Sequence, residues 1–169
     1  MSELPRLTLV LGGARSGKSH YAEELLMRAP PSWTYVATAE AFDDEMRDRI
    51  AHHRARRDER WQTLDAPLAL AATIPTLERP SLIDCLTLWL SNTMLAGRDV
   101  EAETGALLAA LAEAPAPLIA VSNEVGLGLV PETPLGRAFR DAQGRLNQKV
   151  AAAADRVVFM AAGLPLILK

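Results

Sequence analysis

The sequence predicts an α/β protein with a mostly parallel sheet and helices on both faces. Short apolar runs of strand length alternate along the chain with longer segments of helical spacing. Strands that alternate with helices pack as a parallel sheet that is covered on both sides. A glycine-rich turn directly follows the first apolar run and precedes a helical segment. The length of 169 residues suggests one domain with one core, spanning residues 1–169.

The first part of the chain contains three apolar runs and two helical segments. The runs "LTLVL" (7–11), "WTYVA" (33–37) and "SLIDC" (81–85) are predicted to be buried strands. The segment 18–29 carries its apolar residues on one side, which predicts an amphipathic helix. The segment 40–60 is polar and charged, and its few apolar residues have helical spacing, which indicates a solvated helix.

The second part of the chain continues this alternation. The predicted elements are a helix over 86–96, a helix from an Asp99 cap to about Glu113, a strand over 117–123, a helix around 135–153, and two strands joined near Gly163. A loop rich in glycine and proline follows the strand over 117–123. Asn123 and Glu124, where this loop begins, are expected either to shape a ligand site or to form a structural turn, because ligands bind at the carboxyl ends of strands in open α/β sheets.

The composition is that of an ordinary globular protein and argues against several functions. The net charge of −3 argues against bulk attraction to nucleic acid or to anionic membranes. The single cysteine, Cys85, excludes an internal disulfide and a cysteine-based metal cluster, and it fits a reducing cytoplasm. The first apolar run is too short for a signal peptide, and no segment approaches the ~20 residues that cross a membrane. A cytoplasmic protein is therefore expected.

The turn "GGARSGKS" matches G-x-x-x-x-G-K-[ST], the pattern of a phosphate-binding loop. Its glycines let backbone N–H groups turn toward phosphate oxygens, and the following helix presents its positive N-terminal end to the same anion. Lys18 is expected to contact the β- and γ-phosphates, and the Ser19 hydroxyl to bind Mg²⁺. The predicted nucleotide-binding loop comprises Gly12, Gly13, Ala14, Arg15, Ser16, Gly17, Lys18 and Ser19. The side chain of Arg15 either adds a phosphate contact or is solvated.

A second, acidic element is expected to help hold the metal. Enzymes with a phosphate loop of this kind commonly use an acid at the end of a neighbouring apolar strand. The run "SLID" ends at Asp84, which is therefore the predicted second Mg²⁺ ligand beside Ser19. The alternative role of Asp84 is to cap the helix that follows it.

Two adjacent histidines lie in the densest block of positive charge, "RDRIAHHRARRDER" (47–60), which contains six arginines. Guanidinium groups match phosphate geometry, and like-charge repulsion favours a neutral imidazole, which is a competent nucleophile. Adjacent residues on a helix point ~100° apart, so at most one of His52 and His53 is expected to face a nucleotide. The alternative is a solvated helix face with charge pairs such as Asp43/Arg47.

Four blocks of the sequence together resemble one known family. "TLVLGGARSGKSHYAE", "YVATAEAFDDEMRDRIAHHRARRDERW", "LIDCLTLWLSN" and "VSNEVGLGLVPETPLGRAFRDAQGRLNQKVAAAADRVV" are similar to the bifunctional adenosylcobinamide kinase / adenosylcobinamide-phosphate guanylyltransferases of cobalamin biosynthesis. The resemblance implies a RecA-like P-loop fold and a homotrimer. It also implies two reactions: phosphorylation of adenosylcobinamide with ATP or GTP, and transfer of GMP from GTP onto adenosylcobinamide phosphate, which gives adenosylcobinamide-GDP and pyrophosphate.

The resemblance also implies roles for individual residues. The second reaction of the family passes through a GMP-histidine intermediate, and the family pattern R-I-x-x-H-x-x-x-R aligns the nucleophile with His53. The family's guanine-nucleotide contacts align with Gly12–Ser19, Ala37, Thr38, Ala39, Arg54, Ala55, Arg56, Arg57, Asp65 and Asp84. The family often has glutamate where this chain has Asp65 and Asp84, so contacts from these shorter side chains are expected to shift or to pass through water. The rival functions are a plain P-loop small-molecule kinase and a nucleotide-binding regulatory module.

Overall fold

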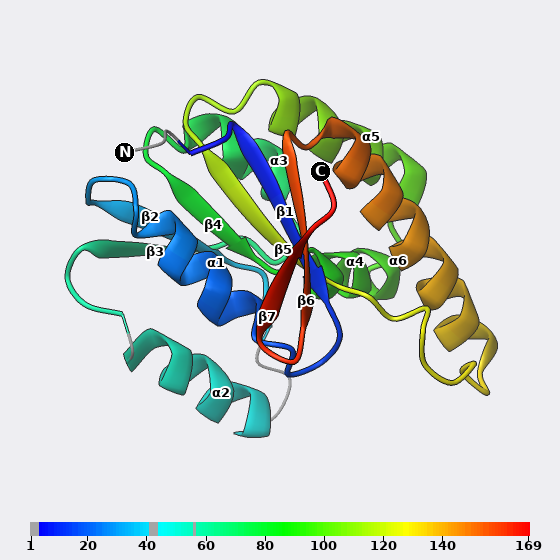
Figure 1. Cartoon of the computed structure of the whole chain (residues 1–169). Helices are drawn as coiled ribbons and strands as arrows, with labels where there is room; N and C mark the ends of the chain where they lie inside the picture. The colour runs from blue at the N-terminus through cyan, green and yellow to red at the C-terminus, as the bar shows by residue number, and fades with distance from the viewer. Residues whose placement is uncertain (1–3, 41–43, 56) are drawn as a thin grey trace.

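The computed structural model of the chain describes residues 4–40, 44–55 and 57–169, except for some side chains within 44–55. These residues form a seven-stranded sheet with the strand order β3-β2-β4-β5-β1-β6-β7 (Figure 1). The strands are β1 (Leu7–Gly12), β2 (Trp33–Ala37), β3 (Trp61–Asp65), β4 (Ser81–Asp84), β5 (Leu118–Asn123), β6 (Arg156–Ala161) and β7 (Leu164–Ile167). Neighbouring strands are parallel except for β6 and β7, which form an antiparallel hairpin. The predicted α/β class with a mostly parallel sheet is confirmed.

Helices cover both faces of the sheet, as predicted (Figure 1). They are α1 (Lys18–Leu26), α2 (Asp44–Ala55), α3 (Leu70–Thr73), α4 (Leu86–Leu95), α5 (Val100–Ala112) and α6 (Pro134–Ala153), with a 3₁₀ turn, η1, at Ile74–Thr76. Helix α1 packs on one face, and α3, α4, α5 and α6 form the layer on the other. Among the described residues, no helix is both long and apolar enough to cross a membrane.

The apolar core has two layers, one on each side of the sheet. Along β1, Leu9 and Leu11 pack with Trp89 in the layer under α3 to α6, whereas Val10 packs with Leu25 under α1. Successive side chains of a strand point to opposite faces, so the continuous apolar run of β1 supplies both layers. Because β1 is packed on both faces, its position in the sheet is fixed. The glycine-rich turn at its end is fixed with it.

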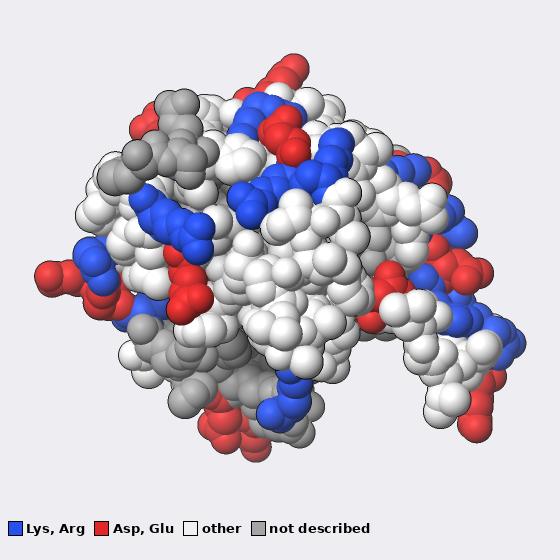
Figure 2. All heavy atoms as spheres, viewed as in Figure 1, with Lys and Arg blue, Asp and Glu red and all other residues white. Residues whose placement is uncertain are grey.

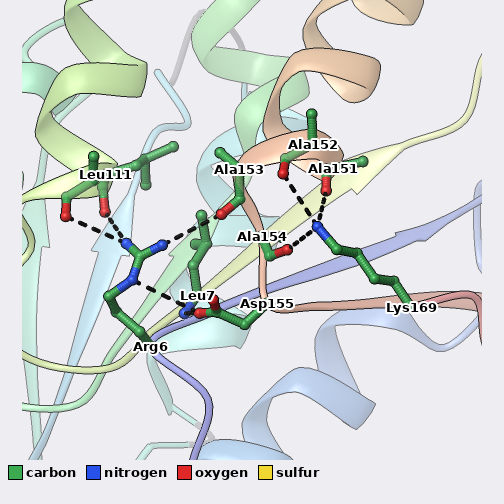
Figure 3. Close-up of polar contacts among 10 residues, drawn as sticks. Arg6, Leu7, Leu111, Ala151, Ala152, Ala153, Ala154, Asp155 and Lys169 are labelled. Carbon is green, nitrogen blue, oxygen red and sulfur yellow. Dashed lines mark hydrogen bonds and ion pairs between the residues drawn. The ribbon is translucent and has the colours of Figure 1, made fainter.

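Near the start of β1, two positively charged side chains bind backbone carbonyl groups at the ends of α5 and α6 (Figure 3). Arg6 donates to the carbonyl oxygens of Leu111 (2.9 Å) and Ala153 (3.3 Å), which joins the ends of α5 and α6. Lys169 donates to the carbonyl oxygen of Ala154 at 2.5 Å, just beyond α6. The last carbonyls of a helix lack intrahelical partners and carry partial negative charge, so these cations stabilise the C-terminal end of α6.

Some boundaries and three elements differ from the predictions, since the short helix α3, the turn η1 and the strand β3 were not predicted. Helix α1 ends at Leu26 rather than at residue 29, because the prolines that follow at 30 and 31 disfavour a helical conformation before them. Helix α2 spans Asp44–Ala55, and the described residues 57–60 of the predicted segment 40–60 are not helical. Strand β3 was missed because its sequence lacks a continuous apolar run. The strand lies at the lateral edge of the sheet, and each of its five residues is only partly buried or exposed.

The predicted helix cap and C-terminal hairpin are confirmed. The Asp99 carboxylate accepts from the backbone N–H groups of Glu101 (3.0 Å) and Ala102 (3.1 Å), the arrangement expected of an N-cap. Strands β6 and β7 are joined through Gly163, which has a left-handed φ of 78°. Glycine adopts this conformation without the steric cost of a Cβ atom.

Candidate functional site

The glycine-rich loop lies at the carboxyl edge of the sheet, between the end of β1 and the start of α1. Gly12 ends β1 and is in register with Asn123 at the end of β5. The next strand, β4, ends nearby at Asp84, in register with Val121 of β5. The backbone N–H of Glu124 donates to the Gly12 carbonyl oxygen at 3.0 Å. The topology therefore places the loop, Asp84 and the Asn123–Glu124 segment at one edge, where ligands bind in open α/β sheets.

The loop has the backbone geometry of a phosphate cradle. Gly17 precedes α1 in a left-handed conformation (φ 93°), and Arg15 is also left-handed (φ 55°), with its side chain exposed. The backbone N–H of Gly163 donates to the Ser16 carbonyl oxygen at 3.0 Å, so the β6–β7 turn supports the loop from outside. The Ser16 hydroxyl is buried and has no hydrogen-bond partner among the described residues.

Lys18 points back into the loop. Its side chain is buried, and Nζ donates to the Gly13 carbonyl oxygen at 2.7 Å. Burial lowers the pKa of Lys18 because desolvation disfavours the ammonium form, and the negative charge of Asp84 acts in the opposite direction. A phosphate oxygen would be a stronger partner for this ammonium group than a neutral carbonyl. The geometry therefore suits Lys18 to the phosphate contact predicted for it.

Gly12 is packed so closely that a side chain there has no space. A Cβ atom at this position would lie 2.5 Å from the Ser16 Oγ and 2.7 Å from the Met160 carbonyl oxygen. The Met160 oxygen belongs to the backbone of the neighbouring strand β6 and cannot move aside without shifting that strand. Because Gly12 has no side chain, the loop can pack directly against β6.

Replacing Gly12 with alanine is expected to lower the free energy of unfolding by about 1–3 kcal/mol and to weaken nucleotide binding, because overpacking shifts the loop. Urea unfolding and a nucleotide-binding titration measure the two effects. Gly105→Ala is the matched control: Gly105 lies on the exposed side of α5 with nothing within 4 Å of the added Cβ atom. An unchanged unfolding free energy for Gly12→Ala would contradict the close packing.

The acidic part of the site is built around Tyr35. The Tyr35 hydroxyl donates to Asp84 Oδ2 at 3.0 Å, and the Arg57 guanidinium carbon lies 3.5 Å from the centre of the Tyr35 ring. Burial, reinforced by the negative charge of Asp84, raises the pKa of Tyr35, so the phenol remains a hydrogen-bond donor at neutral pH. Asp65 ends β3 in register with Ala37, which is itself in register with Asp84. Three predicted contact residues thus lie across adjacent strand ends.

Thr38 links the carboxyl ends of the neighbouring strands β2 and β4. Its hydroxyl donates to the Cys85 carbonyl oxygen (2.7 Å) and accepts from the Cys85 N–H (2.8 Å). Its own carbonyl oxygen accepts from Asn92 Nδ2 at 2.8 Å. These bonds fix the backbone beside Asp84. Ala37 and the half-buried Ala39, on either side of Thr38, therefore also lie at the carboxyl end of β2.

The proposed histidine nucleophile belongs to helix α2. The side chains of His52, His53 and Arg54, and all of Arg56, lie outside the described residues, and so does Asp43 of the expected Asp43/Arg47 pair. Ala55 is exposed at the end of α2. Arg47 forms an ion pair with Asp44 at 2.7 Å. The approach of His53 to a nucleotide therefore stays a prediction.

The alternative cap role of Asp84 is wrong. The N-cap of α4 is Cys85, and no side chain caps that helix. The structure adds Tyr35 to the site, a residue that the sequence analysis missed. A signal was present, because a tyrosine inside an otherwise buried strand needs a hydrogen-bond partner for its hydroxyl group.

Comparison with known proteins gives one family and one fold. The family model for cobinamide kinase / cobinamide phosphate guanyltransferase matches residues 8–168. The bifunctional adenosylcobalamin biosynthesis protein CobP of Pseudomonas aeruginosa is 50% identical over 95% of this chain and 96% of its own length. The bifunctional adenosylcobalamin biosynthesis protein CobU of Salmonella typhimurium is 39% identical over 96% of this chain and 99% of its own.

Solved structures with the same fold have much lower sequence identity. The RadB recombinase aligns with 92% of this chain and 74% of its own, with a TM-score of 0.55 and 17% identity. A prototypical ATPase from the type III secretion system of pathogenic bacteria aligns with 97% of this chain and 57% of its own, with a TM-score of 0.61 and 11% identity. These likenesses confirm the expected RecA-like P-loop fold.

Proposed function

Because the chain belongs to the cobinamide kinase / cobinamide phosphate guanyltransferase family, a family of bifunctional transferases, we propose that it acts on adenosylcobinamide in two steps. It first phosphorylates adenosylcobinamide with ATP or GTP. It then transfers GMP from GTP to adenosylcobinamide phosphate and releases pyrophosphate. The observation that carries this proposal is the phosphate loop, with Lys18 and Asp84 beside it, inside a family match that spans residues 8–168.

The kinase step rests on positioning and charge stabilisation by the loop. Backbone N–H groups of the loop and the N-terminal end of α1 bind the phosphates, and Lys18 exchanges the Gly13 carbonyl oxygen for a phosphate oxygen. Mg²⁺, when bound, neutralises phosphate charge, and it prefers oxygen ligands such as the Ser19 hydroxyl and the Asp84 carboxylate. Asp84 fits this role because Tyr35 engages only Oδ2, and no described residue donates to Oδ1.

The guanylyl step uses His53 as the nucleophile. A nitrogen of its neutral imidazole forms a bond to the α-phosphorus of GTP, while the bond from that phosphorus to the β-phosphate oxygen breaks and pyrophosphate leaves. A phosphate oxygen of adenosylcobinamide phosphate then attacks the same phosphorus, and the P–N bond breaks to return the imidazole. The kinase and guanylyl steps occur at different phosphorus atoms, so the triphosphate and His53 must be able to change their relative position. We expect the helical segment predicted over 40–60, which contains α2, to be the part that moves.

We also propose that the chain assembles as the homotrimer that the family resemblance implies, and exposed apolar side chains are available for its contacts. Leu127 and Leu129, in the loop between β5 and α6, have exposed fractions of 82% and 96%. Leu164 and Leu166 on β7 are 70% and 59% exposed, and Figure 2 shows an uncharged area over the β6–β7 hairpin. Large exposed apolar areas are typical of surfaces that another molecule covers. We assign them to contacts between subunits and to the large corrinoid acceptor.

One labelling experiment on the wild-type protein tests the proposed function. The protein is incubated with α-labelled GTP and Mg²⁺ and then denatured; a covalent label that survives alkali and is lost in acid is expected from a phosphoramidate. Labelling with γ-labelled ATP and adenosylcobinamide is expected to give labelled adenosylcobinamide phosphate. Kinase product without a protein label would support the plain kinase instead, and nucleotide binding with neither product would support the regulatory module.

A further inference from the structure

Tyr35 links an acidic and a basic part of the site through a single side chain. It lies in the middle of β2, only 5% exposed, in register with Leu82 of β4. Its hydroxyl reaches two residues further along β4 to Asp84 Oδ2, at 3.0 Å. Its ring face lies under the Arg57 guanidinium, 3.5 Å from the guanidinium carbon. One buried side chain therefore contacts both partners, Asp84 through its hydroxyl group and Arg57 through its ring face.

The hydrogen bond fixes the orientation of the Asp84 carboxylate. An aspartate at the end of a strand can rotate its carboxylate, and the phenol holds one oxygen in place. No described residue donates to the other oxygen, Oδ1. Asp84 ends β4 at the carboxyl ends of the strands, where Lys18 also lies at the start of α1. A preoriented carboxylate binds a cation better than a freely rotating one, because less side-chain entropy is lost on binding.

Arg57 is held in a different way. The attraction of a cation to the face of an aromatic ring fixes its position. Its Nε and Nη1 atoms are buried, and neither has a hydrogen-bond partner among the described residues. Guanidinium N–H donors without partners are costly when buried, and they match the oxygens of a phosphate group. Two buried donors of the stacked guanidinium thus lack a partner among the described residues, on the same ring whose hydroxyl group bonds to Asp84.

We propose that Tyr35 is a positioning residue with two separable roles: its hydroxyl group orients Asp84 for the Mg²⁺–nucleotide complex, and its ring seats Arg57 as a receptor for nucleotide phosphate. This inference rests on the proposed function, because it takes a nucleotide as the ligand. It goes beyond that function by assigning to one side chain the relative placement of a cation ligand and an anion ligand.

Two substitutions separate the roles. Tyr35→Phe removes the hydroxyl and keeps the ring, so the affinity for a fluorescent GTP analogue in EDTA is expected to stay within about twofold of wild type, while the gain in affinity on adding Mg²⁺ falls by about tenfold. Tyr35→Leu removes both groups, so the affinity in EDTA is also expected to fall, by about threefold to tenfold, as the arginine loses its seat. Equilibrium titrations with and without Mg²⁺ measure both effects.

Three comparisons distinguish positioning from a general structural role. Tyr21→Phe changes the other tyrosine of the chain, on α1, and is expected to alter neither affinity. In an Asp84→Asn background, Tyr35→Phe is expected to cause no further loss of the Mg²⁺ effect, because the two residues act as a unit. Thermal unfolding of each variant checks the fold.

The possible outcomes separate this inference from the proposed function. Wild-type protein that binds no GTP analogue even with Mg²⁺ would contradict the proposed function itself. Wild-type protein that binds normally, with a Tyr35→Phe variant of unchanged Mg²⁺ dependence, would overturn the role of the hydroxyl and leave the proposed function standing. A Tyr35→Leu variant with the EDTA affinity of Tyr35→Phe would overturn the seating of Arg57.

Discussion

Replacing Lys18 with methionine is expected to reduce both kinase and guanylyl turnover by about 10²–10³-fold, the usual cost of losing one preorganised charge-stabilising donor. Methionine keeps the unbranched, apolar stem of lysine and removes only the ammonium group that now donates to Gly13. Both reactions are affected because the same loop would hold the triphosphate in each step. Steady-state assays of each half-reaction, with adenosylcobinamide or its phosphate as acceptor, measure the loss.

The stability of this variant is expected to change in the opposite direction. Burial lowers the pKa of Lys18, which means that the folded protein disfavours the ammonium form relative to the unfolded chain. Removing the charge is therefore expected to leave the melting temperature equal or higher. Lys149→Met is the control: Lys149 forms a solvent-exposed ion pair with Glu101 at 2.6 Å, and such pairs contribute little. Unchanged turnover in Lys18→Met would contradict the assignment of the loop.

Local sequence patterns were sufficient to locate the phosphate loop. The strand, the glycine-rich turn with its lysine, and the helix follow one another in the chain. Each is recognisable from its own residues, because the glycines allow the tight turn and the motif spacing is fixed. The same holds for Asp99, whose cap depends only on the next three residues. Elements of this kind are predictable because the interactions that form them are local.

The rest of the site depends on register between distant strands, which no local pattern encodes. The closeness of Gly12 to the Met160 carbonyl follows from the pairing of β1 with β6. The Tyr35–Asp84 hydrogen bond follows from the pairing of β2 with β4. Strand β3 was missed for a related reason: an edge strand buries little surface, so composition alone does not separate it from the polar segment before it.

The relation between Asp84 and its surroundings shows what structure adds to a motif. The sequence left two roles open for this residue, a metal ligand or a helix cap. The cap is excluded because Cys85 occupies the N-cap position of α4. The remaining role gains support from Thr38, which fixes the backbone on either side of the strand end, and from Tyr35, which orients the carboxylate.

His53→Asn is expected to abolish the acid-labile label from α-labelled GTP while leaving phosphorylation of adenosylcobinamide largely intact. Asparagine removes the nucleophilic nitrogen but keeps a side chain of similar polarity on α2, and the phosphate loop with Lys18 is unchanged. The two activities therefore separate in this variant, whereas both fall together in Lys18→Met. Filter-bound label after denaturation and a kinase assay on the same preparation measure the two effects.

The adjacent histidine supplies the control. His52 and His53 are consecutive in α2. Adjacent residues of a helix are expected to point ~100° apart, so we expect only one of the two to reach the in-line position opposite the leaving pyrophosphate. His52→Asn is therefore expected to retain the label. The reverse result, with label lost in His52→Asn and kept in His53→Asn, would move the nucleophile by one residue. Label retained in both variants would contradict a nucleophile at either position and would place the covalent nucleotide on another residue.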